Sequence, residues 1–206
     1  MTRRLSFATS MALILAMTAG ASWAKSEAAD YTRNGFHVSA LGLVGIPTYD
    51  GALDGTFEAA FPAAGSVDVG ISGGFSIRAG YRLHPRFSTE LGFEWIAPYK
   101  VEVGGDEVSE VSTWMFFVDT RIHVMTGRVQ PFLLIGMGAY HLDFSLPPSA
   151  TGAIDATDFA PRLGGGLDYY FTQSIALTSE VVYVIGTRRL FELDYVGISL
   201  GLTYRF

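Results

Sequence analysis

Hydrophobic and polar positions alternate with a period of two through most of the chain, from Phe36 to the C-terminus. Side chains of a β-strand point in turn to opposite faces, so this period predicts strands rather than helices. The alternating segments cover residues 36–46, 71–83, 87–97, 112–124, 130–144, 159–171, 175–185 and 194–206. We therefore expect an all-β protein with eight antiparallel strands.

One face of each predicted strand carries no charged residue. In the strand over 130–144 we assign this face to Phe132, Leu134, Gly136, Gly138, Tyr140, Leu142 and Phe144. The opposite faces hold the ionisable side chains, namely Arg78, Arg82, Glu90, Glu94, Asp119, Arg121, His123, His141, Asp143, Arg162, Asp168, Glu180 and Arg205. Such strands can form a soluble barrel with its charges outside or a membrane barrel with its charges inside.

Two features of the sequence favour the membrane arrangement. Aromatic residues on the uncharged faces gather near the strand ends, at Phe36, Tyr81, Phe87, Phe132, Tyr169, Phe171, Tyr204 and Phe206 for one rim and at Trp95, Trp114, Tyr140, Phe144, Phe159 and Tyr183 for the other. Two aromatic girdles are typical of the membrane interfaces, as is the alternation between tight turns and long polar loops. A soluble lipocalin-like barrel would explain the period but neither the girdles nor the uncharged face.

These features predict an eight-stranded, up-and-down antiparallel transmembrane β-barrel with both termini in the periplasm. Closure is required in lipid, because an open sheet edge would leave backbone groups without hydrogen-bond partners. Pro161 falls inside the sixth predicted strand and has no N–H to donate to the ladder. We expect a bulge or a late strand start at that position.

The first residues have the features of an export signal. Arg3 and Arg4 precede a short apolar core over 11–17, and Ser22-Trp23-Ala24 forms a small-x-small cleavage site. The core is shorter than the roughly 20 apolar residues of a spanning helix, which argues against the alternative of an uncleaved anchor. We assign residues 1–24 to a signal peptide, 25–33 to a short periplasmic segment and 34–206 to the barrel.

Composition excludes several kinds of site. The chain has no cysteine, so disulfides, thiolate metal sites and thiol nucleophiles are ruled out. Its formal net charge is -6, and it becomes more negative when Arg3 and Arg4 leave with the signal peptide. We expect no nucleic-acid partner, because phosphate binding needs clustered Lys and Arg. The four histidines lack a compact ligand spacing and the glycine clusters lie within strands, so we expect neither a metal nor a cofactor.

The C-terminal residues carry a family resemblance. The chain ends Ser-Leu-Gly-Leu-Thr-Tyr-Arg-Phe, which fits the outer-membrane assembly signal with Ser199, Gly201, Tyr204 and Phe206 at its key positions. The stretches Gly136-Met137-Gly138-Ala139-Tyr140 and Gly164-Gly165-Gly166-Leu167-Asp168-Tyr169 also resemble strands of small OmpA/OmpX-type barrels. The resemblance covers nearly the whole mature chain. It implies an outer-membrane protein that is delivered by periplasmic chaperones and inserted by the barrel assembly machinery, and we expect a monomer in contact with outer-membrane lipid.

The charged face has two interpretations. Eight strands enclose a space that side chains just fill, and buried charges persist when they are paired, so a salt-bridged plug is the simpler one. A narrow path for water or ions, lined by Arg78, Arg82, Glu90 and Glu94, is the alternative.

A second alternative is an enzyme that modifies lipid A, suggested by His141, Asp143 and Ser145. His141 and Ser145 do not fit a His-activated serine well, because we expect their side chains to point to different faces. We interpret His141 and Asp143 as an interior polar pair.

The predicted outer loops are rich in Asp and Glu, and the last one holds Arg188 and Arg189. Solvated acidic loops are the ordinary interpretation. The more specific hypothesis is that Arg188 and Arg189 contact lipopolysaccharide phosphates. We expect a non-enzymatic barrel with a role in envelope integrity or in surface interaction through these loops.

Overall fold

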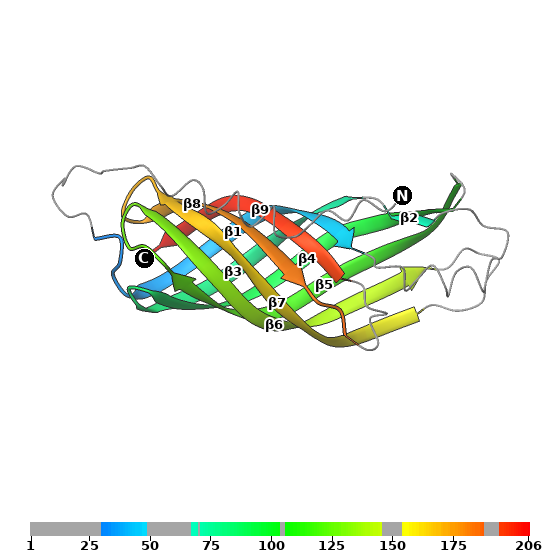
Figure 1. The fold of residues 1–206 in the computed structure, drawn as a ribbon, viewed down its shortest axis with the longest axis horizontal. Helices are drawn as coiled ribbons and strands as arrows, with labels where there is room; N and C mark the ends of the chain where they lie inside the picture. The colour runs from blue at the N-terminus through cyan, green and yellow to red at the C-terminus, as the bar shows by residue number, and fades with distance from the viewer. Residues whose placement is uncertain (1–29, 49–66, 70, 104–105, 146–153, 188–193) are drawn as a thin grey trace, which may run out of the picture.

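The computed structural model describes residues 30–48, 67–69, 71–103, 106–145, 154–187 and 194–206 (Figure 1). The strands are β1 (Gly35–Thr48), β2 (Val67–Val69), β3 (Ser72–His84), β4 (Phe87–Val103), β5 (Asp106–His123), β6 (Val129–Ser145), β7 (Ile154–Tyr170), β8 (Ile175–Val184) and β9 (Asp194–Arg205). No helix in these ranges is long and apolar enough to cross a membrane.

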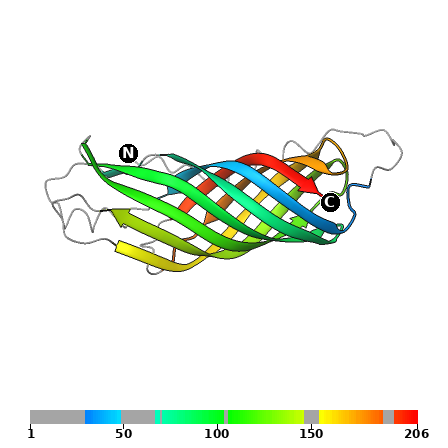
Figure 2. The same cartoon turned by 180° about the vertical axis from the view of Figure 1, so that it is seen from behind.

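Eight of the strands close into an antiparallel barrel, as predicted. Around the ring the order is β1, β3, β4, β5, β6, β7, β8 and β9, and β9 returns to pair with β1. Figure 2 shows the same tilted ring of strands from behind. β2 is a three-residue addition that pairs only with the far end of β4. We call the end with the tight connections the turn end and the opposite end the loop end.

Several strands run further toward the loop end than their hydrophobic pattern predicts. β4 and β5 remain paired as far as Val103 and Asp106, and β7 begins at Ile154. The reason is that backbone pairing does not require an apolar face. Lys100 and Glu110 are paired in register there, so the ladder continues where the hydrophobic alternation has ended.

The outward faces of seven barrel strands are those predicted, but the assignment for β6 was wrong. Leu133, Ile135 and Met137 point outward, whereas Leu134 and Tyr140 are buried inside the barrel. Both faces of β6 are apolar at these positions. The period of two therefore predicted a strand but did not show which of its two faces points outward. As a result, Phe132 and Tyr140 belong to the interior and not to the two aromatic rims.

Pro161 neither breaks nor bulges its strand. The β6–β7 register is continuous through the pair Met137–Pro161. The carbonyl of Pro161 accepts a hydrogen bond from the Ile185 N–H (3.0 Å), just beyond the last β7–β8 pair. The N and C=O of one residue point to the same side in an antiparallel strand, so the missing donor lies where that ladder ends.

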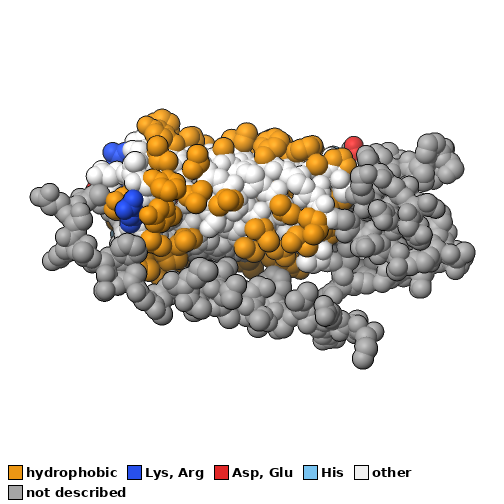
Figure 3. All heavy atoms as spheres, turned by 90° about the horizontal axis from the view of Figure 1, so that it is seen from above, with side chains coloured by type: hydrophobic (Ala, Val, Ile, Leu, Met, Phe, Trp, Pro, Cys, Tyr) orange, Lys and Arg blue, Asp and Glu red, His pale blue; other side chains and the backbone are white. Residues whose placement is uncertain are grey.

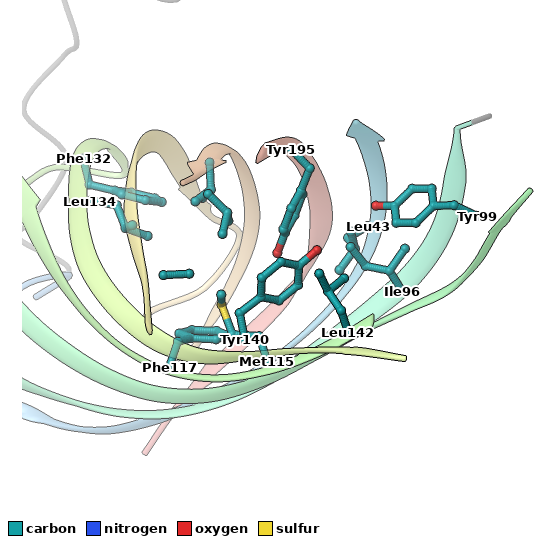
Figure 4. Packing of buried hydrophobic residues seen from close by; sticks show 13 residues of the cluster. Leu43, Ile96, Tyr99, Met115, Phe117, Phe132, Leu134, Tyr140, Leu142 and Tyr195 are labelled. Carbon is teal, nitrogen blue, oxygen red and sulfur yellow. The ribbon is translucent and has the colours of Figure 1, made fainter. Parts of the chain in front are cut away.

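The barrel interior is not uniformly polar. Buried apolar side chains, including Leu43, Ile96, Met115 and Tyr195, form a cluster inside the barrel (Figure 4). Tyr140 and Tyr195 point toward each other within it, with ring centroids 5.7 Å apart. The outer wall is also apolar, and Figure 3 shows hydrophobic side chains spread along it. The charged residues of the interior therefore lie between packed side chains on a closed wall.

Candidate functional site: the charged lumen

The strongest ion pair of the lumen joins Arg78 of β3 to Glu180 of β8. The Arg78 Nη1 donates to Glu180 Oε2 (2.7 Å), and Nη2 donates to Oε1 of the same carboxylate. The Arg78 Nε donates to Ser76 Oγ (3.0 Å). A planar guanidinium that binds both carboxylate oxygens is the strongest form of this interaction.

Arg121 of β5 extends the same cluster across the barrel. Its Nη2 lies 3.1 Å from Oε2 of both Glu90 and Glu180. The other oxygen of Glu90 is 2.8 Å from Nε2 of His37. One guanidinium thus connects carboxylates from β4 and β8, and the cluster reaches β1 through His37.

A second cluster is centred on Arg162 of β7. Its Nε lies 3.3 Å from Asp119 Oδ1, and its Nη2 lies 3.5 Å from Glu94 Oε2. The Tyr195 hydroxyl donates to the other oxygen of Glu94 (2.6 Å). Every charged group of this cluster therefore has an opposite charge within 4 Å, which buried charges need.

Phe117 of β5 lies beside an arginine of each cluster. The Arg162 guanidinium carbon lies 3.8 Å from its ring centroid, and that of Arg78 lies 5.3 Å away. A cation over an aromatic face is stabilised by the negative potential of the ring. Phe117 is almost completely buried, so its ring fills part of the lumen next to both guanidinium groups.

A chain of hydroxyl groups leads away from Asp168. Thr178 Oγ1 donates to Asp168 Oδ1 (2.7 Å), and it lies 2.7 Å from Thr203 Oγ1. Thr203 Oγ1 is 2.8 Å from Ser39 Oγ. Each hydroxyl has a single proton, so donation to the carboxylate fixes the order Ser39 to Thr203 to Thr178 to Asp168. The chain ties β1, β9, β8 and β7 together inside the barrel.

At the turn end, the segment before β1 lies over the lumen. The Tyr31 carbonyl accepts hydrogen bonds from Arg82 (3.3 Å), Gln130 (3.0 Å) and Arg205 (2.5 Å), which come from β3, β6 and β9. Arg205 also donates to the carbonyl of Asp30 (3.0 Å). Asp30 accepts hydrogen bonds from the Thr32 N–H and hydroxyl, which lower the pKa of its carboxyl below the ordinary value.

The predicted interior network is brought together with one exception. The lumen buries Arg78, Arg82, Glu90, Glu94, Asp119, Arg121, Arg162, Asp168, Glu180 and Arg205. The placement of Asp143 in this network was wrong, because the inverted β6 turns it to the exposed outer surface. Arg82 and Arg205 are buried as predicted, but they bind backbone carbonyls instead of acids.

The same inversion moves His141 to the outer surface. Its ring stacks on Trp114, with centroids 4.6 Å apart, and its Nδ1 lies 2.8 Å from Thr157 Oγ1. The interior pairing of His141 with Asp143 was therefore also wrong.

Other predicted site residues are placed as follows. Ser199 and Gly201 point into the barrel, whereas Tyr204 and Phe206 face outward at the turn end. Arg188 and Arg189 lie outside the described residues. No group of three or more potential metal ligands occurs in the described ranges.

Three residues of the lumen were not predicted from the sequence. Phe117 and Tyr195 lie on the same strand faces as the charged residues, so an aromatic residue at that parity was an available signal. Tyr31 acts through its backbone carbonyl, and no sequence pattern marks such a role.

The lumen and the apolar wall are those of a membrane barrel, and comparison with known families gives the same result. The outer membrane protein beta-barrel domain family matches residues 11–206. This chain belongs to that family. It is therefore an outer-membrane protein. A search of curated protein sequences gave no significant match.

Solved structures agree on the fold. Neisserial surface protein A is similar with a TM-score of 0.60 at 16% identity, over 84% of this chain and 97% of that one. The N-terminal β-barrel domain of OprF from Pseudomonas aeruginosa gives 0.54 at 15% identity, over 84% and 100%. The attachment invasion locus protein Ail of Yersinia pestis gives 0.50 at 13% identity, over 84% and 97%. Identities this low establish a shared fold and nothing finer.

Proposed function

We propose that this protein is a non-enzymatic, non-conducting barrel that supports the outer membrane and presents its loops for surface interactions. The observation that carries the proposal is the pair of buried ion clusters that pack against Phe117. Arg78, Arg121 and Arg162 are each at most 1% exposed, and they come from three different strands. Side chains held this way occupy the cross-section through which a solute would have to pass.

Single-channel recording of the refolded mature protein in planar bilayers tests the closed lumen. We expect no stable conductance steps at moderate voltage. Large, reproducible steps would contradict the proposal and favour the narrow channel. That alternative has some support, because Arg121 Nε and Asp119 Oδ2 have no hydrogen-bond partner among the described residues.

The role in the envelope needs a cellular test. Cells that lack the protein should become more sensitive to a large antibiotic that an intact outer membrane excludes, and the wild-type gene should restore resistance. Two of the similar structures are named as a surface protein and an attachment invasion locus protein, which is consistent with a surface-interaction role for the loops. Both parts of the proposal would be contradicted if cells without the protein kept the antibiotic sensitivity of the wild type and also bound to surfaces as the wild type does.

The lipid-modifying enzyme has one observation in its favour. His141 faces outward beside the hydroxyl of Thr157, and an imidazole next to a hydroxyl is the minimum of an activated nucleophile. The contact is also what a histidine at an interface makes for structural reasons, and a threonine inside a strand is an uncommon nucleophile. Mass spectrometry of lipid A from cells with and without the protein separates the two, and we expect identical acylation.

A further inference from the structure

Charge is distributed unevenly along the barrel axis. The described lumen holds five arginines and five carboxylates, and it is neutral if its histidines are uncharged. Outside the lumen, the exposed charged side chains of the turn end are Arg33, Arg86 and Arg128, with Asp30 as the only side-chain carboxylate among the described residues there. The C-terminal carboxylate of Phe206 lies at the same end. Figure 3 shows basic side chains at this end, just beyond the hydrophobic wall. A cationic rim on a chain of net charge -6 calls for an anionic partner.

Arg86 and Arg128 lie on two adjacent turns. The Arg86 carbonyl accepts a hydrogen bond from the His123 N–H (2.8 Å) at the end of β5, and Arg128 directly precedes β6. They therefore flank the end of β5, with about two strand spacings, or roughly 10 Å, between their backbones. The Arg128 side chain is directed toward the end of β7, so the two cations are neighbours along the rim and each can meet a separate lipid headgroup.

The two side chains have donors to spare. Arg86 has no side-chain hydrogen bond or ion pair with another described residue. Arg128 donates its Nε to the Tyr170 carbonyl (2.8 Å) and its Nη2 to the Phe171 carbonyl (3.4 Å). A guanidinium has five N–H donors, so Arg128 is oriented by the barrel and keeps three for a ligand.

The depth of Arg86 and Arg128 in the membrane indicates which ligand they can bind. Phe87 follows Arg86 directly and is exposed on the outer wall, and the Arg128 guanidinium carbon lies 5.4 Å from the Tyr169 ring centroid. Aromatic residues at the edge of an apolar wall mark the level of the lipid headgroups. Arg86 and Arg128 thus lie at the depth of phospholipid phosphates, with aromatic side chains beside the upper part of the acyl chains.

We infer that Arg86 and Arg128 make this part of the rim a binding site for the headgroups of anionic phospholipids in the periplasmic leaflet. Each guanidinium binds its own lipid phosphate with its free donors, and Phe87 and Tyr169 contact the lipids below. This site is independent of the lumen and of the loops, so it goes beyond the proposed function.

Electron spin resonance of lipid probes tests the site. The mature protein is refolded into phosphatidylcholine vesicles that contain a trace of spin-labelled phosphatidylglycerol or spin-labelled phosphatidylcholine, and the relative association constants are measured. We expect the wild type to prefer phosphatidylglycerol several-fold, and 1 M salt to reduce the preference through screening. At its own position on the rim, each arginine should favour the anionic lipid about fivefold, the usual effect of one basic residue near an anionic surface.

Three variants make the result specific. The double variant Arg86→Gln/Arg128→Gln should lose the preference, Lys100→Gln near the other end of β4 should keep it, and Arg128→Lys should retain most of it because the charge remains. A heat-modifiable gel shift confirms that each variant is folded. The inference is overturned if the wild type shows no preference, or if the folded double variant keeps the wild-type value.

Discussion

Arg78 and Glu180 form a two-pronged ion pair across the seam at which the barrel closes. Arg78 lies on β3 and Glu180 on β8, and between them are β1 and β9, the strands whose pairing completes the ring. The pair therefore joins the two sides of the closing seam from within. Its burial makes it sensitive to the loss of either partner.

Glu180→Gln should be among the most destabilising conservative substitutions in this chain. It removes the carboxylate that binds Arg78 through both oxygens and leaves Glu90 as the carboxylate nearest to both Arg78 and Arg121. Breaking a buried pair costs about 3–5 kcal/mol when the remaining charge has no other partner, so we expect a loss near the lower end of that range. The measurement is urea unfolding in lipid vesicles, followed by tryptophan fluorescence. Arg86→Gln, at an exposed position, should change the free energy of unfolding by less than about 0.5 kcal/mol.

A double variant separates charge imbalance from packing. In Arg78→Met/Glu180→Leu both charges are removed and apolar volume is kept, so the loss should be smaller than for Glu180→Gln alone. If Glu180→Gln costs less than about 1 kcal/mol, the ion pair does not hold the seam.

Gly201→Ala should weaken the seam from the backbone side. A Cβ at Gly201 would lie 2.1 Å from the Ala40 carbonyl oxygen and 2.5 Å from the Leu41 Cα, both on β1. Because backbone atoms cannot swing aside, β1 and β9 must separate, at a cost of about 1–3 kcal/mol. We expect slower appearance of the folded gel band and a lower urea midpoint.

Gly73→Ala is the matched control for this prediction. It is also a glycine in a strand, but a Cβ there meets nothing within 4 Å. The variant should be neutral or slightly more stable. Equal behaviour of the two alanine variants would show that close approach at the seam is not why Gly201 is required.

The phase of β6 can be measured directly, since the chain has no native cysteine to interfere with labelling. Single cysteines at Leu133, Leu134 and Ile135 are spin-labelled in lipid vesicles, and collision with oxygen is recorded. Leu133 and Ile135 are more than half exposed on the wall and Leu134 is 3% exposed, so the first and third labels should be accessible to oxygen and the second protected. If the label at Leu134 were accessible and those at Leu133 and Ile135 protected, the outward face of β6 would be the one predicted from the sequence.

The segment before β1 should act as a stabilising cap of the turn end. Deletion of residues 25–33 from the mature chain removes the Tyr31 carbonyl and leaves Arg82, Gln130 and Arg205 without it. The three side chains keep hydrogen bonds to the Pro85, Gly127 and Gln173 carbonyls, so the loss is the net contribution of the bonds to Tyr31. A hydrogen bond contributes about 0.5–1.5 kcal/mol, so the urea midpoint should fall. Deletion of 25–29 alone keeps Asp30 and Tyr31, and it should leave the midpoint near that of the intact mature chain.

The sequence by itself determined the strands, the uncharged wall and the closed barrel. A period of two places successive side chains on opposite faces of a strand. When one face has no charged residue and the other has several, the uncharged face is the one that contacts lipid. Arg78, Glu90, Arg121 and Glu180 could be assigned to the lumen for this reason. The lengths of the connections distinguished the turn end from the loop end.

Only the tertiary structure decided the phase of β6 and the pairing inside the barrel. Leu133 and Leu134 are equally apolar, so hydropathy does not decide which of them points into the barrel. The register of β6 with its neighbours decides it, and the β5–β6 register pairs Asp119 with Gly136. Which carboxylate meets which guanidinium depends on strand tilt and stagger, because Arg78 and Glu180 are far apart in sequence and lie on strands that are not neighbours. Contacts of this kind are set when the ring closes, and no local pattern of residues contains them.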